Sequence, residues 1–382
     1  GEESVHGWKI GSCGLPECIA EAKELSHWDE KRKKDNFSKS QRLRGIGLAC
    51  CNHVSGYRPI LKDFDGSSAL VKVGPDGKAI VFSGEVDIGQ GYRTIAAQCA
   101  AEELGIPLEY VEVADVDSQT SVLGIGSLAS RGTVMGGNAV VRAAADAKEK
   151  ILHGIEGLLN KASGTIKITE GKFVDQQGEI LGTFSEMVRR LCNAHSGEPI
   201  MGSGYYYPDT VIPDPITKFG NTSPAYPFGA HVAEVEIDME TGKVTVVNYA
   251  AVNDVGKVIN PMMAVGQLAG GVLQGIGWVL SENLVVLQGK IVNPNLLDYK
   301  IPTMADMVET NTGLVEAPDD NGPYGAKSLG EAALDPVAAA VCNAISHALG
   351  TRITKIPVLE EDILAIIKKK YGTQGGEGCG CT

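Results

Sequence analysis

Short runs of alternating apolar and polar residues, separated by turn residues, predict β-hairpins along much of the chain. The clearest hairpin joins a strand at 230–237 to a strand at 244–249 through the turn Glu240-Thr241-Gly242. The same signals predict further hairpins at 69–82, at 166–174 and around Gln288-Gly289-Lys290, and a single strand at 110–113.

Helical periodicity predicts helices between these hairpins, at about 92–104, 133–160 and 184–193, from Asn260-Pro261 onward, and from an N-cap at Asp335 to Gly350. The helix after Asn260-Pro261 contains several glycines, including Gly266, Gly270 and Gly275. Each glycine costs about 1 kcal/mol relative to alanine in an exposed helix. We therefore expect another group to lie close against the backbone of this helix.

Hairpins with helices between them, and no repeat of fixed period, predict an α+β protein of two related layers. The 382 residues are enough for two subdomains that each bury a core. We expect an N-terminal linker segment at 1–45, a first subdomain at 46–225, a second at 226–370 and a flexible tail at 371–382. The stretch 194–228 is long for a loop and is therefore functional or a boundary. Tyr205, Tyr206 and Tyr207 are aromatic candidates for a substrate pocket, although core packing explains them equally well.

The charge balance is acidic, with 47 Asp and Glu against 34 Lys and Arg. No cluster of basic residues with interleaved aromatics occurs, which argues against a nucleic-acid or anionic-membrane surface and favours small molecules or protein partners. The apolar stretch 271–287 is interrupted by polar residues and the first thirty residues are charged throughout. We therefore expect no membrane span and no signal peptide, and a soluble, cytoplasmic protein.

The nine cysteines are odd in number and scattered, which is not the pattern of a disulfide framework. Cys13 and Cys18 have the first spacing of a plant-type iron–sulfur motif, but the next cysteine of that motif is missing. Cys379 and Cys381 lie in the predicted flexible tail. No zinc-type spacing, nucleophile elbow or phosphate-binding loop is present, and the seven histidines are isolated along the chain.

Four glycine-rich turns are the candidates for ligand binding, at 87–91, 126–131, 266–271 and 325–331. Because glycine lets a backbone approach a bound group closely, turns spaced far apart suggest one extended cofactor that is contacted from several sides. Gly89-Gln90-Gly91 lies between a strand and a helix, where backbone N–H groups can hold an anion, although a plain tight turn explains it equally well. Gly124 to Ala129 matches a dinucleotide fingerprint, but the polar residues before it do not form a buried strand, so we reject a Rossmann site.

Glu331 ends the last of these turns and is the only obvious acid–base candidate among them. A glutamate before a helix most often complements the helix dipole. The aliphatic neighbours Leu329, Ala332, Ala333 and Leu334 suggest an apolar pocket, in which a carboxylate is a stronger base than in water. Gln267 and Gln274 share one helix face and either bind a ligand or pack.

Taken together and in this order, these segments resemble the molybdenum hydroxylases related to xanthine dehydrogenase, aldehyde oxidase and 4-hydroxybenzoyl-CoA reductase, over about residues 45–365. The resemblance implies a molybdopterin-binding domain of the xanthine oxidase type, with Glu331 as the catalytic base. It implies cofactor contacts at Ile88, Gly89, Gln90, Gly91, Ser127, Ala129, Ser130, Arg131, Thr133, Gln267 and Gly330. No protein residue is expected to ligate the metal.

Two departures from the family qualify this resemblance. Molybdenum subunits of the family are normally about twice this length, and their front half carries a Gly-Gly-x-Phe loop and an Arg-Gly-rich loop that this sequence lacks. The chain therefore resembles the back half of a split subunit, as in nicotinate dehydrogenase. Ala332-Ala333 stands where xanthine-type enzymes have two prolines, which weakens the case for a purine substrate, whereas 297–302 and 322–327 are similar to the 4-hydroxybenzoyl-CoA reductase branch.

The resemblance further implies a molybdopterin in its cytosine dinucleotide form, a partner chain with the front half of the domain, and partner subunits that carry [2Fe-2S] and FAD, in a dimer of heteromers. The implied reaction hydroxylates, or in reverse reductively dehydroxylates, an electron-poor carbon of an aromatic, N-heterocyclic or aryl-CoA substrate. Two alternatives remain open: a subunit that only clamps the cofactor, and a nicotinamide-dependent dehydrogenase. The retained Glu331 argues against the first, and the polar residues before Gly124 argue against the second.

Overall fold

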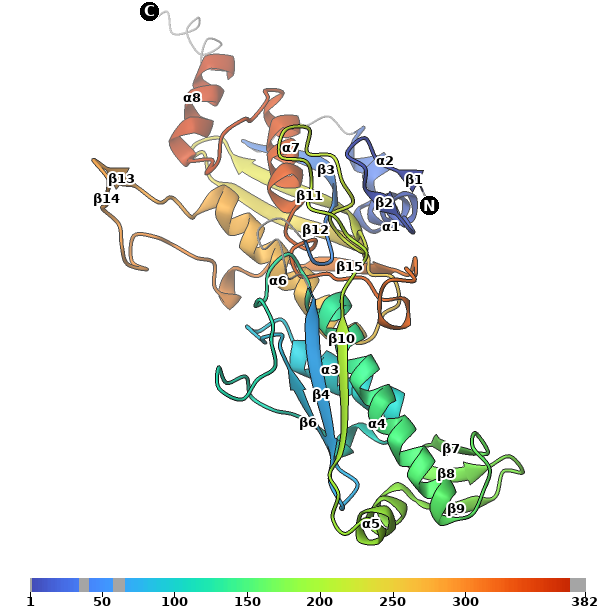
Figure 1. The fold of residues 1–382 in the computed structure, drawn as a ribbon. Helices are drawn as coiled ribbons and strands as arrows, with labels where there is room; N and C mark the ends of the chain where they lie inside the picture. Colours follow the sequence, from blue (N-terminus) through green and yellow to red (C-terminus); the bar gives the residue numbers. More distant parts are fainter. Residues whose placement is uncertain (1, 34–40, 58–65, 372–382) are drawn as a thin grey trace, which may run out of the picture.

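The computed structural model describes residues 2–33, 41–57 and 66–371 and shows two lobes, each with a four-stranded sheet and helices packed on it (Figure 1). This arrangement confirms the predicted α+β class. Most predicted hairpins and helices form at the expected positions, because their turn residues and apolar periods are local signals.

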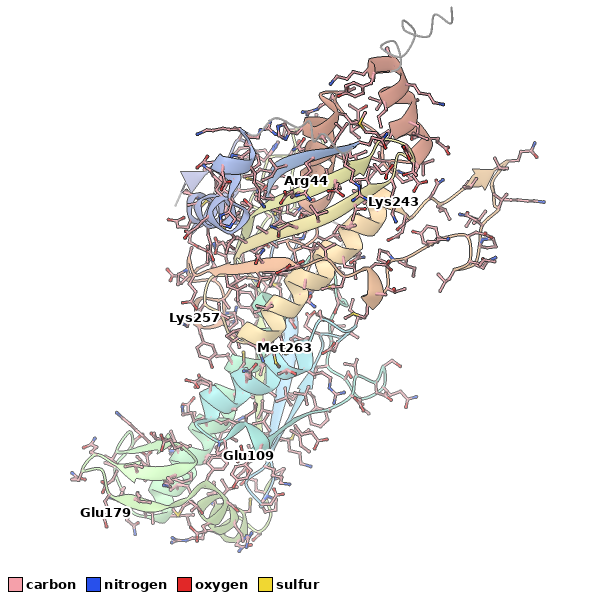
Figure 2. All side chains as sticks on the ribbon, turned by 180° about the vertical axis from the view of Figure 1, so that it is seen from behind. Arg44, Glu109, Glu179, Lys243, Lys257 and Met263 are labelled. Carbon is pink, nitrogen blue, oxygen red and sulfur yellow. The ribbon has the colours of Figure 1, made fainter. Side chains whose placement is uncertain are left out.

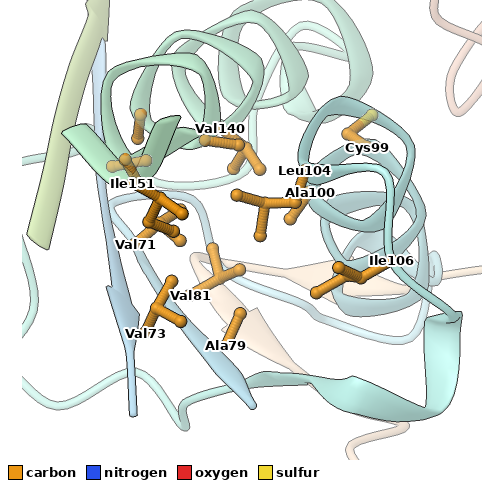
Figure 3. Close-up of a cluster of buried hydrophobic side chains, with 14 of the residues drawn as sticks. Val71, Val73, Ala79, Val81, Cys99, Ala100, Leu104, Ile106, Val140 and Ile151 are labelled. Atoms are coloured by element: carbon orange, nitrogen blue, oxygen red, sulfur yellow. The ribbon is translucent and has the colours of Figure 1, made fainter. Parts of the chain in front are cut away.

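The first lobe contains a sheet in the order β10-β4-β5-β6. Its strands are β4 (Ser67–Val73), β5 (Ala79–Ser83), β6 (Val111–Val113) and β10 (Ile200–Tyr206). Two helices pack against it, α3 (Tyr92–Leu104) and α4 (Gly137–Leu158), the latter extending a π-helical turn, η2 (Gly132–Gly136). Val71 and Val81 from the sheet meet Leu104, Val140 and Ile151 from the helices in the core between them (Figure 3).

A small appendage continues the first lobe at the end remote from the second lobe (Figure 1). It consists of a three-stranded antiparallel sheet and the helix α5 (Phe184–Ala194), with strands β7 (Ile166–Thr169), β8 (Lys172–Asp175) and β9 (Ile180–Thr183). Thr183 and Glu186 form a capping box that fixes the start of α5. A short 3-10 turn, η1 (Leu108–Tyr110), precedes β6.

The second lobe contains a sheet in the order β15-β12-β11-β3. Its strands are β3 (Arg42–Asn52), β11 (Phe228–Asp238), β12 (Val244–Asp254) and β15 (Thr310–Val315). The sheet packs against α7 (Val337–Leu349) and α6 (Pro261–Leu280), with α8 (Glu360–Tyr371) beyond them. Two 3-10 turns, η3 (Met304–Asp306) and η4 (Pro323–Gly325), lie in the connections around β15.

The same device brings a helix close to the sheet in both lobes. A Cβ added to Gly202 or Gly204 of β10 would lie 2.1 or 2.3 Å from the backbone of Ala143 in α4. A Cβ on Gly45 of β3 would lie 2.1 Å from the backbone of Ala344 in α7. In each lobe, glycines on a strand face alanines on a helix, so the strand and helix backbones are in direct contact, as expected for two related layers.

Residues before β3 form more than a linker. They fold into β1 (Glu2–Glu3), β2 (Lys9–Ile10), α1 (Leu15–Ser26) and α2 (Trp28–Lys31). Cys18 and Ala22 of α1 are fully buried against β11 and β12, so this segment covers part of the second sheet. The sequence could not show this packing because helical periodicity does not reveal which sheet a helix covers.

The structure corrects three further expectations. β3 pairs with β11, so the start of the predicted first subdomain belongs to the second sheet. The expected loop 194–228 contains β10, in which Tyr206 is buried while Tyr205 and Tyr207 are exposed. α7 begins at Val337 with Pro336 at its N-cap position, and the Asp335 side chain has a different role, described below.

The connection from α6 to β15 forms an arm that projects from the second lobe (Figure 1). At its tip lies the predicted hairpin, β13 (Val286–Leu287) with β14 (Lys290–Ile291). Apolar side chains are exposed along the arm, among them Leu284, Val286, Leu287, Leu296, Leu297 and Met304. The predicted flexible tail and its two cysteines lie outside the described residues.

Candidate active site

All four glycine-rich turns line one cavity of about 340 Å³ at the junction of the two lobes. Figure 2 shows Met263 and Lys257, two of its lining residues, at this junction. Of the predicted site residues, those that line the cavity are Ile88, Gln90, Ser127, Ser130, Arg131, Thr133, Gln267, Gly330 and Glu331. Gly89, Gly91 and Ala129 belong to the same turns without lining the cavity, and Tyr205 to Tyr207 do not line it either.

The turn before α3 does not offer its N–H groups to an anion. The carboxylate of Asp87 accepts hydrogen bonds from Gly89 N at 2.8 Å, Gly91 N at 3.4 Å and Arg93 N at 3.0 Å. Burial alone would raise the Asp87 pKa, but these hydrogen bonds outweigh burial and lower it. The protein's own carboxylate therefore caps this helix N-terminus, which favours the tight-turn interpretation of the segment.

Gln90 and Ser127 join the first two glycine turns. The Gln90 side chain accepts from Ile88 N at 2.6 Å and donates from Nε2 to the Val86 carbonyl at 2.9 Å and to Ser127 Oγ at 3.3 Å. Ser127 Oγ also donates to the Val86 carbonyl. The polar atoms of both side chains are therefore used within the cavity wall, which fixes the shape of this side of the cavity.

Gly91 allows α6 to approach the first lobe. Its φ is +84°, and a Cβ at this position would lie 1.9 Å from Met263 Cε, on the first turn of α6. Asn260 caps that helix by accepting from Met263 N at 3.1 Å, and its Nδ2 donates to Gln98 Oε1 of α3, also at 3.1 Å. Contacts across the two lobes thus position the start of α6 beside the cavity.

Glycines in the C-terminal half of α6 lie in close contact with a neighbouring segment. A Cβ on Gly271 would lie 2.9 Å from the Ala333 carbonyl, and one on Gly275 would lie 2.5 Å from Val337 Cβ. The predicted close approach is therefore made by the segment that leads into α7. Gly266 and Gly270 face open space instead. Within the described ranges, α6 is also the one helix long and apolar enough to span a membrane, and it packs against α7 and β15.

Glu331 is held by Ser130 from across the cavity. Ser130 Oγ donates to Glu331 Oε2 at 2.9 Å and accepts from Glu331 N at 2.9 Å. Ser130 and its neighbour Ala129 have φ values of +51° and +49°, a left-handed conformation that non-glycine residues adopt at a cost of about 1 kcal/mol or more. The left-handed backbone at Ala129 and Ser130 thus positions the Ser130 hydroxyl, which orients the Glu331 carboxylate.

His53 lies between Glu331 and Asp335. Its Nε2 is 3.1 Å from Glu331 Oε2, and its Nδ1 is 2.9 Å from Asp335 Oδ2. Asp335 follows Glu331 by one turn of chain, with its N–H donating to the Glu331 carbonyl at 3.0 Å. Sequence analysis missed both residues. The spacing of four residues between the carboxylates was a usable signal, but nothing local marked His53.

The apolar side chains near Glu331 are mostly not its neighbours in sequence: Leu329 lines the cavity with it, but the other apolar walls include Ile88, Ile95 and Leu128. The Glu331 side chain is 49% exposed, and Ala332 and Ala333 are buried in the core. The hydrogen bond from His53 is the largest influence on this carboxyl and, with the bonds from Ser130, lowers the Glu331 pKa. Glu331 is therefore an ionised carboxylate over the neutral range rather than the strengthened base that its neighbours in sequence suggested.

The cationic side chains that line the cavity are all paired within the described part of the chain. Arg131 Nε is 2.9 Å from Glu85 Oε1, and both side chains are fully buried. This ion pair therefore has a structural role. Lys327 is paired in the same way with Asp254, and Lys257 lies 3.1 Å from Glu316. Arg131 and Lys327 are thus bound to buried carboxylates, and Lys257 is the half-exposed cation at the cavity.

A few lining side chains retain polar atoms for a ligand. Ser328 Oγ is buried and has no hydrogen-bond partner in residues 2–33, 41–57 and 66–371. Thr133 and Gln267 line the same cavity. A hydroxyl, an amide and a buried unpaired oxygen on different walls suit a heterocycle with several hydrogen-bonding edges, as in a pterin. No group of three or more potential metal ligands is found within these ranges.

Comparison with known proteins agrees with this geometry. The chain is 32% identical over 364 residues to the putative xanthine dehydrogenase molybdenum-binding subunit XdhA of Escherichia coli K12, which spans 92% of this chain and 46% of that protein. It is 30% identical to the nicotine 6-hydroxylase large subunit of Paenarthrobacter nicotinovorans, over 90% of this chain and 43% of that protein. The chain thus spans about half the length of the curated relatives it matches.

A solved structure shares the fold. Quinoline 2-oxidoreductase from Pseudomonas putida 86 superimposes with a TM-score of 0.83 at 28% identity, covering 96% of this chain and 47% of that chain. The molybdopterin cofactor-binding domain profile matches residues 21–308, which include three of the four glycine turns. The chain therefore belongs to the molybdopterin cofactor-binding domain family.

Proposed function

We propose that this chain supplies the catalytic half of the molybdopterin-binding unit of a molybdenum oxidoreductase, with Glu331 as its base. One observation carries the proposal: Glu331 lies on the wall of the cavity that all four glycine turns share. Its recorded side-chain hydrogen bonds, from Ser130 and His53, both reach Oε2. Oε1 is therefore the oxygen that is left to accept a proton from a reacting group.

The residues of this chain would act as follows. Ser328, Thr133 and Gln267 would hold the pterin through their hydroxyl and amide groups, and the strained turn at Ala129-Ser130 would hold Glu331 beside it. When bound, the cofactor supplies two-electron redox chemistry and transfer of an oxygen atom. Glu331, already ionised, would accept the proton of the hydroxyl group whose oxygen is transferred to the substrate carbon.

The names of two relatives and the walls of the cavity support a proposal for the substrate class. Quinoline 2-oxidoreductase and nicotine 6-hydroxylase are named for N-heterocycles, and Ile88, Leu128 and Ile95 provide apolar walls for a flat ring. We propose hydroxylation of an electron-poor carbon in an aromatic or N-heterocyclic substrate. Reductive dehydroxylation of an aryl-CoA is the second candidate, suggested by the wording of residues 297–302 and 322–327.

The other half of the unit would cover the exposed apolar side of the second lobe. The open glycines Gly266 and Gly270 lie on α6 near exposed Met262, and the apolar arm 284–307 projects beyond it. The relatives carry a second half of similar length in the same polypeptide, and that half is the occupant we propose here. Electron carriers, [2Fe-2S] and FAD, would belong to further subunits. The cytosine dinucleotide would be held mainly by another chain, because the described cations that line the cavity are paired.

The assembled enzyme provides the test. Glu331→Gln should abolish turnover of quinoline, nicotinate or xanthine, whichever the wild type oxidises, and leave the molybdenum content unchanged. Glu309→Gln, at an exposed glutamate far from the cavity, is the matched control. Retained turnover in Glu331→Gln would instead support a subunit that only clamps the cofactor. Binding of NAD by the chain would support the dehydrogenase alternative.

A further inference from the structure

His53 sits where two separate carboxylates meet. It follows β3 directly, and its N–H donates to the Pro227 carbonyl at 3.0 Å, which fixes the backbone at this point. Its side chain is 20% exposed, and each ring nitrogen lies within 3.1 Å of a carboxylate oxygen. Neutral imidazole has one N–H and one acceptor nitrogen, whereas carboxylates accept only. Both contacts are hydrogen bonds only when the ring is the cation.

The chain brings the two carboxylates to the ring by one local device. Glu331 and Asp335 are joined by the turn that precedes α7, whose backbone bond links Asp335 N to the Glu331 carbonyl. The turn presents Glu331 to Nε2 and Asp335 to Nδ1. Asp335 therefore fixes the ring orientation from the side away from Glu331, as a carboxylate does behind many functional histidines.

We propose that His53, oriented by Asp335, is a positioning residue that keeps Glu331 ionised and holds its Oε2, so that Oε1 is free to accept a proton. The inference rests on the proposed role of Glu331 as the base. It adds a three-residue unit, Asp335, His53 and Glu331, in which the outer carboxylate acts on the base only through the ring.

The charges around His53 support this arrangement. Burial alone would lower the His53 pKa, but the hydrogen bonds and charges of Asp335 and Glu331 outweigh it and raise the pKa to about 9. Cys51, two residues earlier, lies near Asp335, and burial raises its thiol pKa to about 12, so this thiol adds no charge at neutral pH. Ser130 adds a neutral donor to Glu331. At neutral pH the ring is thus a cation that lies between the Glu331 and Asp335 side chains.

The first test measures His53 directly in the full chain, without substrate. The histidines are labelled with ¹³C, and the His53 ring signal is identified as the one lost in His53→Gln. Its titration midpoint should lie near pH 9 in the wild type. Asp335→Asn and Glu331→Gln should each lower it by about one pH unit or more, because each removes a neighbouring negative charge. A wild-type midpoint near 6.5, or no response to either variant, would overturn the proposal.

The second test uses the assembled enzyme and follows kcat against pH. His53→Gln retains a hydrogen-bond donor but no charge. It should lower kcat by about 10-fold or more, which is typical when a residue that orients a functional group is replaced. It should also move the acid limb of the kcat profile to higher pH, because Glu331 loses the cation that favours its ionised form. A uniform loss of rate with an unmoved limb would mean that His53 has only a structural role. His195→Gln, at an exposed histidine paired with Glu198, is the control and should leave the profile unchanged.

The two tests separate this inference from the proposed function. If Glu331→Gln shifts the His53 titration yet keeps full turnover, the three-residue unit exists but Glu331 is not the base. If Glu331→Gln abolishes turnover while His53 titrates near 6.5, Glu331 remains the base and the positioning role of His53 is wrong.

Discussion

Lys327 Nζ lies 2.6 Å from Asp254 Oδ2, and both side chains are completely buried. Asp254 also accepts from Gly14 N at 2.9 Å, and Lys327 also donates to the Ser12 carbonyl at 3.1 Å. One ion pair therefore connects the N-terminal segment, the end of β12 and the loop that leads to Glu331. This loop forms one wall of the cavity, so the pair determines where that wall lies.

We expect Lys327→Met to lower the free energy of unfolding by about 3–5 kcal/mol, because Asp254 would remain as a buried charge without its partner. Urea denaturation of the two proteins measures the difference. Lys257→Met is the matched control: its lysine lines the same cavity but is half-exposed beside Glu316, so the expected loss is about 1 kcal/mol or less. Equal losses in the two variants would contradict the role given to the buried pair.

Gly91→Ala should disturb the junction of the lobes more than Gly89→Ala. Both glycines have positive φ, so alanine costs about 1–2 kcal/mol at either position. Only at Gly91 does the new Cβ overlap with Met263, whereas at Gly89 it meets nothing within 4 Å. The extra loss at Gly91, measured by urea denaturation, should shrink when Met263→Ala is added. No coupling between positions 91 and 263 would refute the contact.

Alanine substitutions along α6 should have opposite effects on its two faces. Gly266→Ala and Gly270→Ala place a methyl group in open space and should each stabilise the chain by about 0.5–1 kcal/mol. Gly275→Ala should destabilise it by about 1–3 kcal/mol through overlap with Val337. Thermal unfolding separates the three variants. If the other half of the unit covers Gly270, the stabilising variant should also bind that half more weakly in a pull-down.

Acid should weaken the second lobe through His231. The ring is fully buried, with Nε2 2.8 Å from Asn253 Oδ1, and burial lowers its pKa from 6.5 to about 4. His231 is therefore protonated below about pH 6.5 in the unfolded chain but only below about pH 4 in the folded chain. This contribution to stability is complete above pH 6.5 and disappears as the pH falls towards 4.

His231→Gln should remove that part of the pH dependence. Unfolding free energies at a series of pH values should fall less steeply between pH 6.5 and 4 in this variant than in the wild type. His153→Gln changes an exposed histidine and should follow the wild-type curve. Parallel curves for His231→Gln and the wild type would show that another group causes the acid sensitivity.

Local signals in the sequence were sufficient for most elements. The hairpin from β11 to β12 and the helices α3 and α5 form where alternation, turn residues and caps predicted them, because these signals act between residues a few positions apart. The four glycine turns, which were predicted to contact one cofactor, line one cavity. Glycine marks places where backbone must come close, and such places can be read without knowing the fold.

Only the tertiary structure decided which groups meet at that site. His53 and Glu331 are 278 positions apart, and no periodicity links them. The Asp87 side chain accepts hydrogen bonds at the start of α3, and Ala332 and Ala333 are buried in the core while the Glu331 carboxylate faces His53. The sequence by itself therefore determined the elements and the family resemblance. Pairing of β3 with β11 and the meeting of the two lobes determined the charge of the site, since electrostatic effects depend on distance in space rather than along the chain.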